Sequence, residues 1–201
     1  MTTSINLHTQ CALFIACILW VFSAPVLAHS GAGQVGGFVS GFMHPVLGWD
    51  HLVAMVAVGL WGAFLGAPAI YILPVVFPLV MTLGGAAGIV GVPLVGVEIG
   101  IAVSSVVIGL LVAFAVKAPL WIVALIVGIF AIFHGHAHGT ELPHAVNATT
   151  FAIGFVVATG LLHLLGIAIG LLVAAPGGSA AVRVLGAGIA IVGVKFFVGA
   201  V

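Results

Sequence analysis

The near absence of charge limits this chain more than any other feature of its sequence. Of its 201 residues, three are Lys or Arg and three are Asp or Glu, so 3% carry a formal charge while 64% are hydrophobic. A soluble domain carries about 25% charged residues, and nucleic-acid binding needs a basic face that this chain lacks. The composition therefore predicts an all-α membrane protein with the lipid bilayer as its partner, because a spanning helix needs only about 20 apolar residues.

Short joints rich in proline and glycine divide most of the chain into six apolar segments. We expect spans at 46–66, 69–90, 94–116, 119–137, 145–174 and 179–200, preceded by a glycine-rich lead-in or half-helix at 29–43. The 29 glycines amount to about twice the average frequency, which favours close helix packing in lipid. Residues 29–201 are thus predicted to form a single six-helix transmembrane domain, and nothing in the sequence specifies an oligomeric state.

The first 28 residues have the pattern of a secretory signal peptide. A polar start is followed by the apolar run CALFIACILWVF and then by SAPVLA, a small-residue cleavage site that ends at Ala28. The start lacks Lys and Arg, and the alternative is a retained first helix. Cys11 and Cys17 both lie in this segment, so cleavage would leave a mature chain without a disulfide or a thiolate metal site.

Cleavage would place residue 29 outside a bacterial plasma membrane, and six spans would then return the C-terminus to the same side. The joints near Lys117 and Arg183 would face the cytoplasm, in agreement with the positive-inside rule. With this orientation, all three acids and most histidines fall in the outer half of the bundle. They are His44, Asp50, His51, Glu98, His134, His136, His138, Glu141 and His144, whereas His163 lies deeper in the fifth span.

Imidazoles and carboxylates without sulfur are the ligands preferred by borderline divalent ions such as nickel, cobalt, zinc and copper. Ionisable residues inside a membrane are costly and usually functional. His134 and His138 share one helical face, whereas Asp50 and His51 are adjacent and cannot both face one ion on a regular helix. We expect Pro45 at the first position of a helix, with His44 as its N-cap, and Asp50 one to two turns further in.

Several of these residues have a second interpretation. His163 could be a hydrogen-bonded packing residue, His136 and His144 could be interfacial side chains in contact with water, and Glu98 could pair with an imidazole. His29 would be the first residue after cleavage, where its α-amine and imidazole together could chelate an ion. The metal-site candidates are therefore His29, His44, Asp50, His51, Glu98, His134, His136, His138, Glu141 and His163.

Two short motifs resemble those of a known family. HPVLGWDH at 44–51 matches H-P-x-x-G-x-D-H, and FHGHAHGTE at 133–141 matches F-H-G-x-A-H-G-x-E. Together, in this order, they are similar to the HupE/UreJ family of bacterial membrane proteins. The resemblance implies a nickel permease, with cobalt carried by some relatives. It assigns His44, Asp50, His51, His134, His138 and Glu141 to the family motifs, while His136 occupies a variable position.

The expected function is therefore transport of nickel or cobalt from the outer side to the cytoplasm, with the ion as substrate and no resident cofactor. No glycine-rich phosphate loop is present, which disfavours an ATP-driven pump. The main alternative is a zinc-dependent intramembrane hydrolase that uses the same His/Asp cluster to activate water. A haem-binding subunit is disfavoured because its axial histidines would face one another from separate helices, whereas these histidines crowd one end.

Overall fold

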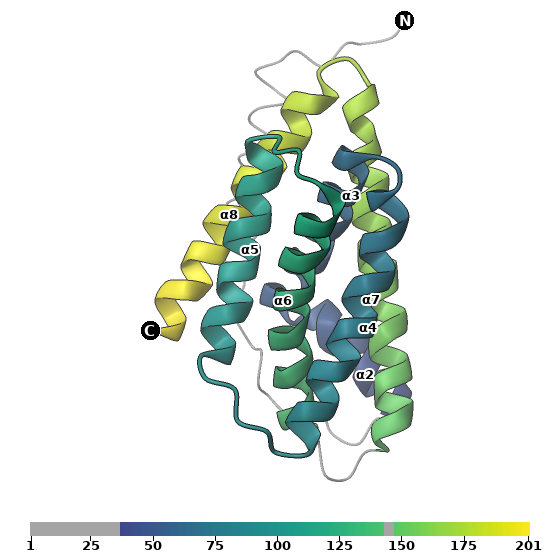
Figure 1. Cartoon of the computed structure of the whole chain (residues 1–201), viewed down its shortest axis with the longest axis vertical. Helices are drawn as coiled ribbons and strands as arrows, with labels where there is room; N and C mark the ends of the chain where they lie inside the picture. The colour runs from purple at the N-terminus through teal and green to yellow at the C-terminus, as the bar shows by residue number, and fades with distance from the viewer. Residues whose placement is uncertain (1–36, 143–146) are drawn as a thin grey trace, which may run out of the picture.

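The computed structural model describes residues 37–142 and 147–201, and every regular element within these ranges is helical (Figure 1). The elements are α2 (Gly37–Leu47), α3 (Trp49–Leu65), α4 (Ala69–Ile89), α5 (Val97–Ala113), α6 (Leu120–Thr140), α7 (Ala148–Gly170), the short 3-10 helix η1 (Leu171–Ala174) and α8 (Gly178–Ala200). The all-α class predicted from composition is confirmed. The predicted signal peptide at 1–28, with His29, and the residue His144 lie outside the described residues.

The long helices have the length and composition of membrane spans. Four helices are each long and apolar enough to cross a membrane, namely α4, α6, α7 continued by η1, and α8. The helices α2 and α3 are long and apolar enough only when they are taken together as one broken span, which is bent by 78° at the break. Helix α5 is apolar but only 17 residues long. The chain is therefore a multi-pass membrane protein, and six spans remain a prediction.

The first expected span differs from the structure at its amino end. His44 is not an N-cap but lies in the last turn of α2, and Pro45 is inside that helix. The break comes at Gly48, whose extended backbone (φ −78°, ψ 100°) makes it the N-cap of α3. Asp50 consequently lies in the first turn of α3, closer to the helix start than expected. A proline after a glycine-rich stretch fits the end of one helix as well as the start of the next, which is why the local pattern misled.

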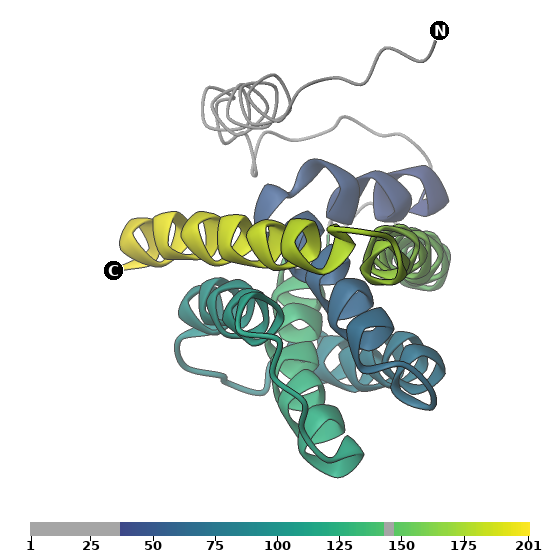
Figure 2. The ribbon, with the colours of Figure 1, turned by 90° about the horizontal axis from the view of Figure 1, so that it is seen from above.

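Glycines bring the helices into backbone contact. On α4 and α6, a Cβ added at Gly84, Gly88, Gly135 or Gly139 would overlap backbone atoms of the facing helix. Gly59 and Gly166 do the same between α3 and α7, and Gly109 and Gly186 between α5 and α8. The successive contacts show that α4 runs parallel to α6 and α3 parallel to α7, whereas α5 and α8 are antiparallel. Figure 2 shows α8 lying along α5.

These pairings gather several helix ends at one end of the bundle. The carboxyl ends of α4 and α6 and the amino end of α7 lie at the bottom of Figure 1, and the amino end of α5 lies at the lower left. An apolar core that includes Met55, Trp61 and Phe77 fills the interior between the helices. At the opposite end, the Arg183 guanidinium donates a hydrogen bond to the Ala113 carbonyl (2.8 Å), beside the loop that contains Lys117.

Candidate metal centre

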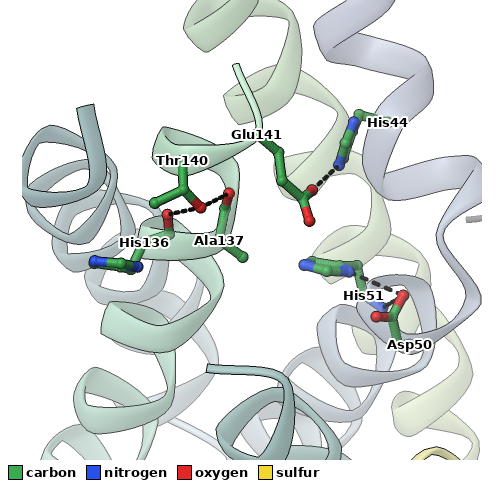
Figure 3. A network of polar contacts seen from close by, with 7 residues as sticks. All are labelled: His44, Asp50, His51, His136, Ala137, Thr140 and Glu141. Carbon is green, nitrogen blue, oxygen red and sulfur yellow. Dashed lines mark hydrogen bonds and ion pairs between the residues drawn. The ribbon is translucent and has the colours of Figure 1, made fainter. Parts of the chain in front are cut away.

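Three side chains from the two motifs meet where α2 and α6 end. His44, His138 and Glu141 each offer one ligand atom, and these atoms all lie within 4.8 Å of one another. The His44 Nε2 atom is 3.7 Å from the Glu141 carboxylate (Figure 3). His44 and His138 occupy the last turns of their helices, where the negative end of the helix dipole favours a cation. We call these three residues the outer triad, because they lie at helix ends rather than in the interior of the bundle.

His51 lies directly behind the outer triad. Its ring centroid is 4.4 Å from that of His138 and 6.3 Å from that of His44. The Asp50 carboxylate accepts hydrogen bonds from both the backbone N–H and the ring Nδ1–H of His51, each at 2.9 Å (Figure 3). With Nδ1 as the donor, the lone pair is on Nε2, which is buried and has no hydrogen-bond partner. Asp50 thus orients His51 as a carboxylate orients a metal-binding histidine.

His134 continues the row of imidazoles inward. Its ring centroid is 4.8 Å from that of His51. The Ser104 hydroxyl donates to the Ile101 carbonyl (2.6 Å), so its oxygen accepts from His134 Nε2–H at 2.9 Å. This arrangement leaves the lone pair of His134 on Nδ1, a buried atom without a partner. Two of the inner histidines are therefore held in defined tautomers, each with one nitrogen available.

Exposure falls along this row from the end of the bundle to its interior. The side chains of Glu141 and His44 are 34% and 30% exposed. His138 and His51 are 7% and 6% exposed, and His134 is fully buried. The ring of Phe155 packs against His138 with centroids 4.0 Å apart. An ion that enters at the outer triad would thus pass from solvent to buried nitrogen ligands over a few ångströms.

Two expected candidates lie apart from this row. His136 points to the other side of α6, as Figure 3 shows, where its Nε2 is 2.7 Å from the Val92 carbonyl. That separation follows from helical geometry, since residues two apart do not share a face. Glu98 is exposed in the first turn of α5, close enough to His51 for its negative charge to act on that imidazole.

His163 lies deeper, in the second half of α7. It is fully buried, and its ring meets that of Phe77 edge-on with centroids 5.3 Å apart. The same Phe77 ring lies 5.6 Å from His134. Along the row of rings, Phe77, His134 and His51 therefore lie between His163 and the outer triad.

Sequence reasoning did not assign a role to Ser104 or Phe155. The two adjacent serines of an otherwise apolar helix could have drawn attention to Ser104. Its partner could not be read from the sequence, because Ser104 and His134 are 30 residues apart in the chain. Nothing in the local sequence distinguishes Phe155 from other core phenylalanines.

The chain is similar to known proteins over most of its length. The chain matches the family described as HupE / UreJ protein over residues 17–196. It is 44% identical over 186 residues to Protein HupE of Rhizobium leguminosarum bv. viciae, a match that covers 92% of this chain and 97% of the relative. No solved structure matches the chain significantly. Because the family match spans most of the chain and includes both histidine motifs, the protein belongs to the HupE / UreJ family.

Proposed function

We propose that the protein is a permease that carries nickel or cobalt from the outer, periplasmic side of a bacterial inner membrane to the cytoplasm. The observation that carries the proposal is the outer triad, in which two imidazoles and a carboxylate offer ligand atoms within 4.8 Å of one another. This ligand set suits borderline divalent ions rather than magnesium or calcium. The family match and the similarity to Protein HupE support the same substrate class.

The ion is captured by Glu141 and His44, whose side chains are partly exposed, and passes to His138 and His51. Asp50 holds His51 with its Nε2 lone pair available. Glu98, exposed nearby, adds negative charge that attracts cations to this end. Because the ligands include neutral imidazoles and no thiolate, the site binds more weakly than a structural metal site, and the ion can leave it.

The orientation follows from charge. Arg183 and Lys117 lie at the end of the bundle opposite the outer triad, and positive residues favour the cytoplasmic side. The outer triad then faces the periplasm, as does the chain that follows the predicted signal peptide. The N-terminus of the mature chain is proposed to lie outside.

Uptake into proteoliposomes tests this function. The purified protein is reconstituted, an inside-negative potential is imposed, and entry of nickel and cobalt is followed with time. We expect saturable uptake by the wild type and its loss in the double variant His44→Ala, Asp50→Ala and in His138→Gln. The faster ion identifies the substrate.

His136→Gln is the matched control, because it replaces a buried histidine of the same helix whose side chain bonds Val92 and not the outer triad. Uptake by this variant should remain close to that of the wild type. Stoichiometric metal binding without any uptake by the wild type would contradict the permease and favour the zinc hydrolase.

A further inference from the structure

The interior of the bundle holds a second group of polar atoms beyond the outer triad. His163 is fully buried, and neither of its ring nitrogens has a hydrogen-bond partner of good geometry. Burying a polar group without a hydrogen-bond partner destabilises a protein. An imidazole kept in this state inside an apolar core is more readily explained by a ligand than by packing.

A backbone oxygen is available beside this imidazole. Pro78 lacks the N–H that would bond the Pro74 carbonyl in a regular helix, so this carbonyl of α4 is left without its helical donor. The Pro74 carbonyl lies near the His163 ring, without the geometry of a full hydrogen bond. The two prolines of α4 therefore expose an oxygen at the level of His163.

A hydroxyl adds a third donor atom. Thr159 is one turn before His163 on the same face of α7, and it is fully buried. A threonine inside a helix usually bonds a carbonyl of the preceding turn, but the Thr159 hydroxyl has no partner. The His163 imidazole and the Thr159 hydroxyl, both buried and both without a hydrogen-bond partner, thus lie one helical turn apart on α7, and the Pro74 carbonyl lies beside the His163 ring.

The ring of Phe77 separates this group from the outer row. The centroid of the Phe77 ring is 5.6 Å from that of His134 and 5.3 Å from that of His163. On the parallel helix α3, the residue level with the His163 backbone is Gly59, eight residues beyond His51. At about 1.5 Å per residue this puts His163 roughly 12 Å deeper than His51.

We propose that His163, Thr159 and the Pro74 carbonyl form an inner subsite for the transported divalent cation, beyond Phe77. This inference rests on the proposed function and extends it to a second stop on the same route. The inner subsite has one nitrogen ligand and no carboxylate among its three groups, whereas the outer triad has two imidazoles and a carboxylate. The inner subsite therefore binds the ion more weakly, and the ion keeps part of its water shell there.

Titration of the full-length protein in detergent with Co²⁺, followed by visible absorption, tests the inner subsite. We expect two binding transitions in the wild type, the weaker one assigned to the inner subsite. His163→Gln keeps a side-chain amide that can donate to Pro74 but lacks the imidazole. It should lose the weaker transition and keep the stronger one, which also reports that the variant is folded. His138→Gln should lose the stronger transition and keep the weaker one.

A cysteine at position 163 gives a positive signature. In a background with Cys11→Ala and Cys17→Ala, His163→Cys should keep the weaker transition and gain a near-ultraviolet thiolate-to-cobalt charge-transfer band. A residue that only packs or bonds Pro74 would give no such band. In proteoliposomes, His163→Gln should lower the maximal uptake rate about tenfold or more, with KM unchanged.

The outcomes separate this inference from the proposed function. A single transition in the wild type, or two transitions that survive His163→Gln together with an absent charge-transfer band in His163→Cys, overturns the inner subsite and leaves the permease intact. Two transitions with the expected variant pattern but no uptake by the wild type support the inner subsite as a binding site and overturn the permease.

Discussion

At the scale of single residues, hydrogen bonds decide which nitrogen of each histidine is available. Asp50 accepts from His51 Nδ1 and leaves Nε2 available, while Ser104 accepts from His134 Nε2 and leaves Nδ1 available. A metal ion can bind only a nitrogen that carries a lone pair. The partners of the histidines therefore matter as much as the histidines themselves.

Asp50→Asn should weaken metal binding without unfolding the protein. The amide oxygen can still accept from the His51 ring, but the negative charge that raises the basicity of His51 is lost. We expect the nickel affinity to fall about 10- to 100-fold, measured by titration calorimetry in detergent, with the melting temperature near that of the wild type. An affinity within the error of the wild-type value would show that the carboxylate does not support His51.

Ser104→Ala should destabilise the protein, because it leaves the His134 Nε2–H buried without a partner. The expected cost is about 1–3 kcal/mol. Ser105→Ala is the matched control, since the neighbouring hydroxyl is equally buried but has no partner to lose. Thermal unfolding in detergent compares the two variants. Equal melting temperatures would show that the bond between Ser104 and His134 contributes nothing to stability.

At the scale of helices, glycine contacts set the positions of the metal ligands. Gly135 and Gly139 of α6 lie against the backbone of α4 at Met81 and Gly85. They alternate with His134 and His138, so the face that packs on α4 and the face that carries the histidines are fixed together. In the first motif, the break at Gly48 sets the positions of the histidines. It turns α2 against α3, so that His44 and His51 lie near one another, with 6.3 Å between their ring centroids.

Gly135→Ala should separate α4 from α6. The added methyl group would overlap the Met81 carbonyl oxygen, and overpacking of this kind costs about 1–3 kcal/mol. Gly128→Ala on the same helix is the control, because no atom lies within 4 Å of its added Cβ. We expect a lower melting temperature and weaker nickel binding for Gly135→Ala alone. Identical behaviour of the two variants would show that the close contact is not needed.

At the scale of the whole molecule, the bundle carries its candidate ligands at one end and the positive charges of Lys117 and Arg183 at the other. Within residues 37–142 and 147–201 all three acids lie at the ligand end. A divalent cation that moves inward through 100 mV gains about 4.6 kcal/mol. That energy supports accumulation of roughly three orders of magnitude.

Accumulation should therefore follow the membrane potential. In proteoliposomes with an inside-negative potassium diffusion potential of 100 mV, nickel should concentrate inside by up to roughly three orders of magnitude. Without a potential, the inner and outer concentrations should become equal. Concentration of nickel at zero potential when a proton gradient is imposed would instead indicate coupling to protons.

The sequence by itself determined the helical membrane class and the two motifs, because composition and residue spacing are local properties of the chain. Helical spacing also placed His134 and His138 on one face, whereas His136 stayed among the candidates until the structure showed its side chain bonded to the Val92 carbonyl. Only the tertiary structure decided that α2 and α3 break at Gly48, that Asp50 bonds its neighbour, and that Ser104 holds His134. These features depend on how closely the helices approach one another at their glycines. The spacing between helices is set by contacts between segments far apart in the chain, which a local sequence pattern does not contain.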